Sequence, residues 1–123
     1  MLRSIMQVFV KGSAEALDFY QKAFNAKVLC AYFSPDGTRL EHSELDVYGQ
    51  VLAVSELLDG EAASGSTMMF CLHMGQGSEA EVERIYETLK EGAVVTSPLG
   101  SCSYSPLETD LVDRFGVRWC IFV

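Results

Sequence analysis

Residues 113–123, Asp-Arg-Phe-Gly-Val-Arg-Trp-Cys-Ile-Phe-Val, hold the clearest structural signal in this chain. Glycine adopts a positive φ without steric cost, so Asp113 to Gly116 predicts a turn. The apolar and aromatic run from Val117 to Val123 predicts a strand. Because such a hydrophobic run does not remain solvated, we expect an interior strand, with Cys120 facing the centre of the molecule.

Composition limits the class of protein. The 123 residues suffice for one domain, and 49% hydrophobic and 21% charged residues are ordinary for a globular protein. A formal net charge of −8 with only nine Lys and Arg residues argues against nucleic acid and acidic membrane surfaces as partners. No apolar run approaches the roughly 20 residues that span a bilayer, and no signal-peptide pattern occurs, so we expect a cytoplasmic protein.

The four cysteines are isolated in the sequence and form no Cys-x-x-Cys pair. This spacing favours neither a zinc ribbon nor a thioredoxin-type centre. In a reducing compartment we expect four free thiols, most of them buried.

The first half of the chain predicts a strand, a helix and three more strands. Ser13 can cap a helix that ends near Asn25, because Leu17, Tyr20 and Phe24 share one helical face. The strands expected from alternation and turn signals are residues 5–10, 27–33, 39–47 and 50–56.

The same order of elements returns after a linker-like segment, residues 57–66. Ser78 and Glu81 form the Ser-x-x-Glu pattern of a capping box, which predicts a second helix. Since Ser13 and Ser78 stand 65 residues apart in corresponding places, the chain is a duplicated strand-helix-three-strand unit. The strands expected here are residues 67–74, 93–97, 102–112 and 117–123.

This βαβββ repeat resembles the vicinal oxygen chelate superfamily, the group of glyoxalases, bleomycin-resistance proteins and extradiol dioxygenases. Three stretches are similar to the first helix, the His-containing third strand and the closing turn of its PhnB-like branch: Ser13–Phe24, Glu41–Leu45 and Asp113–Trp119. The resemblance implies an α+β fold in which two βαβββ modules, about 1–58 and 66–123, form a curved mixed sheet cup. Together they would make a single domain, 1–123.

The resemblance also implies the partners. Many members of this length pair with a copy of themselves, so we expect a homodimer that encloses a site for an unknown small molecule. A curved sheet of apolar strands would otherwise expose much hydrophobic surface, which favours the same arrangement.

The resemblance implies metal positions as well, because metal-dependent members place one His or Glu on the first and last strand of each module. An ungapped alignment puts these positions near Ile5, Glu56, Phe70 and Cys120. Glu56 suits a hard or borderline divalent ion, Cys120 offers a soft thiol, and the other two cannot bind one. A shift of two residues offers Gln7, which scarcely improves the set. We therefore expect no cofactor and no catalytic metal.

His42 and Glu44 form a rival polar pair, since residues i and i+2 of a strand point to one face and His with Glu suits zinc binding or proton transfer. His42 could equally make a structural hydrogen bond, and Cys120 could equally be an inert, buried thiol. The side chains expected to line the cup are Gln7, Phe9, Glu44, Phe70, Tyr104 and Cys120, with Tyr32 and Phe33 as further aromatic candidates.

Three functions stay open at this point. The first is binding of a small organic molecule in an apolar cup without a catalytic metal. The second is a lyase or isomerase of the same superfamily with Glu56 as general base, assisted by His42. The third is an interaction module whose pocket is filled by side chains. Whether the protein is an enzyme is therefore left undecided by the sequence.

Overall fold

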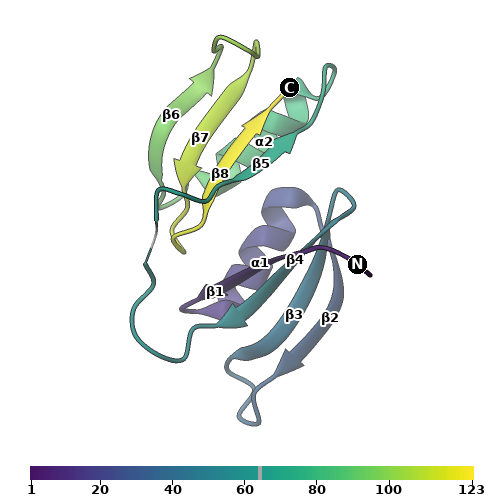
Figure 1. Cartoon of the computed structure of the whole chain (residues 1–123), viewed down its shortest axis with the longest axis vertical. Helices are drawn as coiled ribbons and strands as arrows, with labels where there is room; N and C mark the ends of the chain where they lie inside the picture. The colour runs from purple at the N-terminus through teal and green to yellow at the C-terminus, as the bar shows by residue number, and fades with distance from the viewer. Residues whose placement is uncertain (64) are drawn as a thin grey trace. The chain divides into compact units, whose positions relative to one another are not determined.

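The computed structural model describes residues 1–63 and 65–123. The internal contacts of the chain group into two compact units, Met1–Ala62 (unit 1) and Ala63–Val123 (unit 2). Each unit contains one helix and one four-stranded sheet (Figure 1). Neither of the helices in the described ranges has the length and apolar character needed to cross a membrane.

The two units share one topology. In unit 1 the sheet order is β1-β4-β3-β2, and the outer pair β1 and β4 is parallel while the other pairs are antiparallel. Unit 2 repeats this order as β5-β8-β7-β6. The elements are β1 (Ile5–Val10), α1 (Ser13–Phe24), β2 (Lys27–Phe33), β3 (Leu40–Val47), β4 (Gln50–Glu56), β5 (Phe70–His73), α2 (Glu79–Leu89), β6 (Val94–Gly100), β7 (Glu108–Val112) and β8 (Arg118–Phe122). The expected α+β fold with two βαβββ modules is thereby confirmed.

Helix α1 covers one face of the sheet in unit 1. The backbone N–H and the hydroxyl of Ser13, at the start of α1, donate to the Glu56 carboxylate at 3.0 and 2.8 Å. Val10 is the register partner of Glu56, so Val10 and Val8 also face α1, and both are buried. Gln7 and the other alternate residues of β1 therefore lie on the opposite face, which we name the open face of unit 1.

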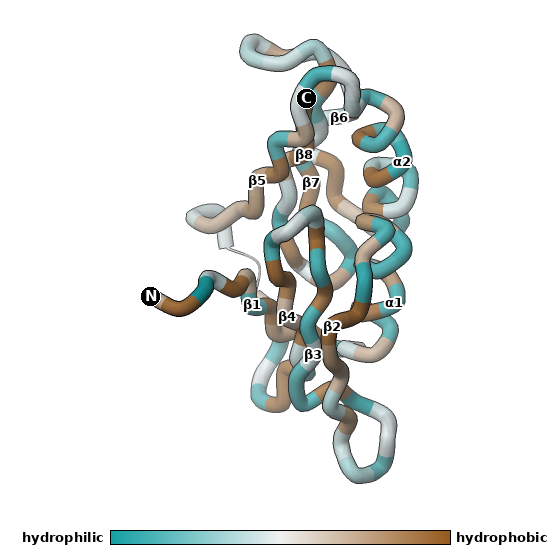
Figure 2. The backbone as a smooth tube through the Cα atoms, turned by 90° about the vertical axis from the view of Figure 1, so that its right-hand side faces the viewer, coloured by the Kyte–Doolittle hydropathy of each residue, from teal (hydrophilic) through white to brown (hydrophobic). Residues whose placement is uncertain are grey.

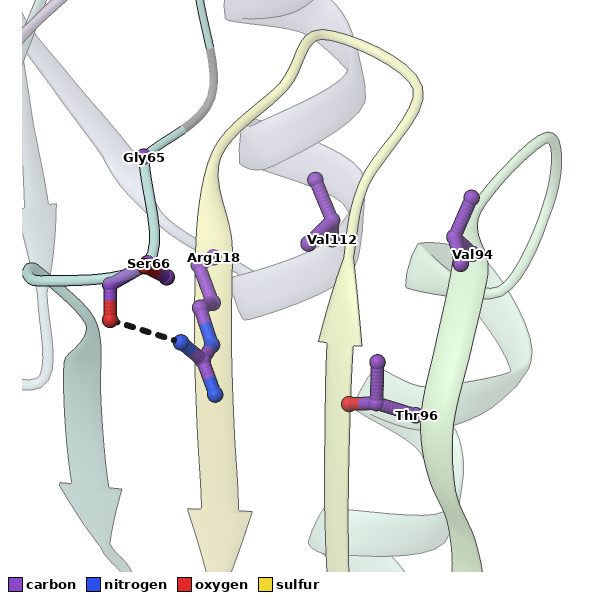
Figure 3. A pocket seen from close by; sticks show the side chains of 6 residues that line it. All are labelled: Gly65, Ser66, Val94, Thr96, Val112 and Arg118. Carbon is purple, nitrogen blue, oxygen red and sulfur yellow. Dashed lines mark hydrogen bonds between the residues drawn. The ribbon is translucent and has the colours of Figure 1, made fainter.

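The sheet of unit 2 divides in the same way. Trp119 and Ile121 of β8 are fully buried, whereas Arg118 and Cys120 alternate with them and point to the other face. Helix α2 lies behind the strands in Figure 3, on the side away from the drawn side chain of Arg118. We name the face that carries Arg118 and Cys120 the open face of unit 2.

Both helices bury one side and expose the other. The hydropathy of the tube alternates between teal and brown along α1 and α2 (Figure 2). The buried side of α1 includes Leu17, Tyr20 and Phe24, as the helical period predicts, and Tyr20 stacks on Phe24 with ring centroids 6.2 Å apart. Helix α1 ends at the left-handed Asn25, also as expected.

The two capping serines behave differently from the prediction. The structure places Gly12 rather than Ser13 at the N-cap of α1, and Ser78 caps α2 without a side-chain hydrogen bond to it. Ser78 Oγ donates to the Met74 carbonyl, and Glu81 pairs with Arg84 instead of closing a capping box. The predicted box is wrong because the short Ser78 hydroxyl donates to a carbonyl four residues earlier, just after β5.

Two strands of unit 2 begin later than expected, and β6 (Val94–Gly100) runs past its predicted end at residue 97. Strand β5 begins at Phe70, and β7 begins at Glu108, although residues 67–74 and 102–112 were expected to be extended. Residues 101–107 form a loop closed by a hydrogen bond from the Cys102 N–H to the Ser105 carbonyl. Pro106 has no N–H to give to a sheet, which explains the later start of β7.

Candidate functional site

Four side-chain positions cross the open face of unit 1 in one row. Gln7 of β1 is opposite Ala53 of β4, Ala53 is opposite Glu44 of β3, and Glu44 is opposite Cys30 of β2. Directly opposed residues share a face, so these four point to the same side. The row brings together one residue from each of the four strands, from Gln7 near the start of unit 1 to Ala53 near its end.

Glu44 is the charged centre of this row. The guanidinium of Arg3 donates to both of its carboxylate oxygens, at 2.8 and 2.9 Å, although Arg3 precedes β1. Nε2 of His42 lies 3.0 Å from Glu44 Oε1. The hydrogen bonds from Arg3, followed by that from His42, lower the pKa of Glu44 to about 2. Glu44 is thus a buried carboxylate whose charge is matched by one strong cation.

Cys30 completes a group of three different ligand types around Glu44. The ligand atoms of Cys30, His42 and Glu44 all lie within 4.8 Å of one another. Imidazole, thiol and carboxylate in such proximity can bind a borderline cation or transfer a proton. The sequence singled out the two members on β3 and missed the one on β2.

Gln7 and Phe9 of β1 lie on the same face as this group, with β4 between them and it. The Gln7 amide donates to the hydroxyl of Ser55 at 3.2 Å, and Ser55 is the register partner of Phe9. Residue Phe9 is 59% exposed, and Tyr32, the partner of His42, is 61% exposed. The open face of unit 1 therefore combines hydrogen-bonding groups with aromatic surface.

Glu56 does not join these residues. Both of its carboxylate oxygens accept hydrogen bonds at the start of α1, from Gly12 N–H at 3.2 Å and from Ser13 at 3.0 and 2.8 Å. Burial by itself would raise the pKa of Glu56, but these hydrogen bonds outweigh it and hold the pKa below its usual value. Its use as a general base stays a prediction, with its oxygens occupied on the helix side of the sheet.

The strand register also separates the four positions of the ungapped alignment. Ile5 is opposite Val51 rather than Glu56, and Phe70 is opposite Trp119, one residue before Cys120. The ring of Phe70 lies 5.4 Å from that of Trp119, on the side of the buried core. Ile5 and Cys120 lie on open faces and Glu56 and Phe70 do not, so these positions do not form one ligand set.

Cys120 and Tyr104 are brought together on the open face of unit 2. The Tyr104 hydroxyl lies 3.7 Å from Cys120 Sγ, and this hydrogen bond raises the pKa of Tyr104. Cys120 Sγ also lies 3.7 Å from Glu108 Oε1. Burial is the main cause that raises the pKa of the Cys120 thiol to about 11. Cys71 is the register partner of Cys120 and is exposed.

This contrast predicts a large difference in thiol reactivity. At pH 8 we expect iodoacetamide to modify Cys120 at least roughly 100-fold more slowly than an ordinary exposed thiol of pKa about 8.5, because little thiolate is present. Cys71 should react at the ordinary rate. Peptide mass spectrometry over a time course measures both sites, and Cys71→Ser is the control for assignment. Equal rates at Cys71 and Cys120 would show that Cys120 is an accessible nucleophile.

The open face of unit 2 also holds an open hollow of about 590 Å³. Arg118 lines it, and its Nη1 donates to the Ser66 carbonyl at 3.2 Å (Figure 3). Arg118 Nε lies 3.7 Å from Asp110 Oδ1, which is a long ion pair, and this oxygen is buried without a hydrogen bond from the described residues. The residues that line the hollow are Gly65, Ser66, Val94, Thr96, Val112 and Arg118.

Sequence reasoning missed Arg3, Cys30, Glu108 and Arg118 as polar groups of the open faces. Cys30 and Glu44 flank the hairpin turn at Ser34–Gly37. Counting outward from that turn could have paired them, but the register shift between Tyr32 and Phe33 changes the count. Nothing in the local sequence signals that Arg3, 41 residues away, reaches Glu44.

Comparison with known proteins agrees with this architecture. The model of the Glyoxalase/Bleomycin resistance protein/Dioxygenase superfamily matches residues 3–121. No curated protein matches the sequence. Among solved structures, protein PA1353 from Pseudomonas aeruginosa aligns with a TM-score of 0.81 and 21% identity, covering 99% of this chain and 97% of that one.

Two further structures have the same fold. The PhnB protein from Bacillus cereus aligns with a TM-score of 0.81 and 18% identity, covering 98% of this chain and 97% of its own. The fosfomycin resistance protein FosX from Listeria monocytogenes aligns with a TM-score of 0.71 and 13% identity, covering 98% and 91%. With the family match over nearly the whole length, these likenesses confirm the expected superfamily: the chain belongs to the Glyoxalase/Bleomycin resistance protein/Dioxygenase superfamily.

Proposed function

We propose that the protein binds a small organic molecule on the open faces of its sheets, without a catalytic metal at the positions that the superfamily uses. One observation carries this proposal: the strands at those positions, β1, β4, β5 and β8, offer amide, hydroxyl, thiol and apolar side chains there. Gln7 and Ser55 represent unit 1, and Cys71 and Cys120 represent unit 2. An amide, a hydroxyl and two thiols, with no carboxylate or imidazole among them, do not supply the ligands of a hard metal ion.

Among the described residues that these four strands place on the open faces, His73 is the exception, because the Glu56 carboxylate is held at the start of α1. Its ring stacks on Phe122 of β8, with centroids 4.5 Å apart and planes 13° apart. A single imidazole with an aromatic neighbour adds stacking surface for a ligand but does not make a metal site.

The groups on the open face of unit 1 suggest the chemistry of the ligand. Phe9 on β1 and Tyr32 on β2 offer exposed rings at the two edges of the sheet, and the Gln7 amide and Ser55 hydroxyl offer hydrogen bonds beside Phe9. The charge of Glu44 is already matched by Arg3. This combination favours an uncharged molecule with an aromatic or alkyl body and a carbonyl or hydroxyl oxygen.

An enzyme of the same superfamily is the second candidate. A mutant of FosX was solved complexed with Mn(II) and a dihydroxypropylphosphonic acid, so metal-bound relatives exist. In this chain the pair His42 and Glu44 is the observation that favours proton transfer, because Nε2 lies 3.0 Å from the carboxylate. A lyase or isomerase reaction would use His42, whereas Glu56 is held at the start of α1.

The homodimer and the cytoplasmic location are further parts of this proposal. Exposed large apolar side chains on β1 and β2 support pairing with a second copy, since a monomer rarely exposes such a surface. They are Phe9, Leu29, Tyr32 and Phe33. Analytical ultracentrifugation across a range of concentrations tests the dimer.

A thermal-shift screen of small alcohols, ketones and aromatic compounds tests the ligand-binding function. A compound that binds only the folded state raises the melting temperature. At a concentration of 100 times its Kd it adds about 2.7 kcal/mol to the free energy of unfolding. We expect Gln7→Ala to weaken the strongest hit about tenfold, because a hydrogen bond of roughly 1.4 kcal/mol is lost. Gln21→Ala, an exposed glutamine on α1, is the matched control.

Two results would contradict the proposal. One is a hit whose affinity is unchanged by both Gln7→Ala and Phe9→Ala, since neither side chain would then contact it. The other is a hit whose binding disappears after the protein is treated with a chelator, since binding would then require a metal ion.

A further inference from the structure

The strand register of the sheet places Cys30, His42 and Glu44 together. Cys30 and Glu44 are directly opposed on the antiparallel strands β2 and β3, and His42 precedes Glu44 by two residues on the same strand. Both relations place the side chains on one face. The backbone therefore fixes the origins of three ligand atoms that lie within 4.8 Å of one another.

The donor set matches a borderline divalent cation. Zinc takes thiolate, imidazole and carboxylate ligands at about 2.0–2.3 Å, so tetrahedral ligands stand roughly 3.3–3.8 Å apart. His42 Nε2 and Glu44 Oε1 are 3.0 Å apart, and the largest separation in the group is within 4.8 Å. Small rotations of the side chains, without a change of backbone, would bring the three atoms to these spacings.

The Arg3 guanidinium would compete with a metal ion for the Glu44 carboxylate. It holds both oxygens of Glu44, but its side chain is 51% exposed and it lies before the first residue of β1. Arg3 can therefore turn to solvent without loss of a sheet hydrogen bond. The charge of Glu44 can then be matched by a metal ion in its place.

We propose that Cys30, His42 and Glu44 bind a zinc-class divalent cation in exchange for Arg3. As the sulfur–metal bond forms, the Cys30 thiol releases its proton to solvent, and the Arg3 guanidinium leaves with its charge unchanged. A fourth position stays open for water. This site lies on β2 and β3, apart from the strands that carry the superfamily's ligands, and the ligand binding proposed above does not depend on it.

Cobalt(II) is the probe that tests this site, because a thiolate bound to cobalt gives a charge-transfer absorption in the near ultraviolet. We expect the full-length protein to show this band on titration with cobalt(II) and to lose it on addition of zinc. Cys30→Ser should abolish the band. Cys102→Ser, which removes another partly buried thiol, should keep it. Circular dichroism of each variant verifies the fold.

Affinities separate the roles of the remaining residues. His42→Ala and Glu44→Gln should weaken zinc binding on the order of 100-fold, the upper range seen even for residues that only support a ligand. Arg3→Gln should strengthen it about tenfold, because the cation then displaces no competing charge-assisted pair. Absence of the band in the unmodified protein overturns the proposal, as does a Cys30→Ser protein that keeps it. Weaker zinc binding by Arg3→Gln would overturn the exchange.

Discussion

Replacing Asp113 by alanine is expected to lower the free energy of unfolding by about 3–5 kcal/mol. Asp113 is buried, and its Oδ1 accepts hydrogen bonds from the N–H groups of Phe115 and Val117 at 2.9 and 3.0 Å. Its Oδ2 accepts from the indole Nε1 of Trp119 at 2.9 Å. Alanine leaves these donors without their acceptor, and the indole group lies in a fully buried ring.

Urea unfolding followed by circular dichroism measures this change. Asp113→Asn is the matched control, because it keeps one side-chain oxygen acceptor and should lose less stability than alanine. A double-mutant cycle with Trp119→Phe isolates the carboxylate–indole pair. An Asp113→Ala protein within about 0.5 kcal/mol of the original, the range of a neutral surface change, would show that the turn does not depend on this carboxylate.

Replacing Glu56 by alanine is expected to cost about 2–3 kcal/mol of stability. Its carboxylate accepts from the backbone N–H groups of Gly12 and Ser13 and from the Ser13 hydroxyl, which in turn accepts from the buried N–H of Leu40 at 2.8 Å. Glu56 thus joins the end of β4, the start of α1 and the start of β3. The negative charge also suits the N-terminal end of a helix.

The pH dependence of stability checks this role with a definite sign. The pKa of Glu56 is lower in the folded protein than the usual 4.5. Its contribution to stability is therefore complete above pH 4.5 and is lost as the pH falls through the folded pKa. Urea midpoints of the original protein and of Glu56→Gln should converge as the pH falls below 4.5. Parallel curves would contradict the role of the charge.

Ligand binding distinguishes this structural role from catalysis. If Glu56 only anchors α1, the Glu56→Ala protein should bind a screened compound as tightly as the original protein at a temperature where both are folded. A loss of binding or turnover without a loss of stability would return Glu56 to the active site expected from the sequence.

The elements of the fold could be predicted because their signals are local. The helical period of Leu17, Tyr20 and Phe24 and the turn at Gly116 depend on residues within a few positions of one another. The strand ends were less predictable: β7 begins only at Glu108 because the loop before it satisfies its own hydrogen bonds. The order of elements and their repetition were enough to reveal the family.

Part of the expected site depended on which face of the sheet each strand residue points to, and the sequence does not determine this. Moving by one residue transfers a side chain to the other face, and this places Glu56 beside α1 while Gln7 and Glu44 stay on the open face. Phe70 was assigned to the cup for the same reason, and its pairing with Trp119 places it toward the core.

The sequence by itself determined the α+β repeat and the buried strand around Trp119, because composition and period are properties of neighbouring residues. Only the tertiary structure decided that Arg3 meets Glu44 and that Cys30 joins His42. Arg3 precedes β1 and meets a residue 41 positions later, and Cys30 and His42 lie on neighbouring strands whose register shifts before the turn. The identity of these contacts follows from strand register, which is set by the packing of the whole sheet.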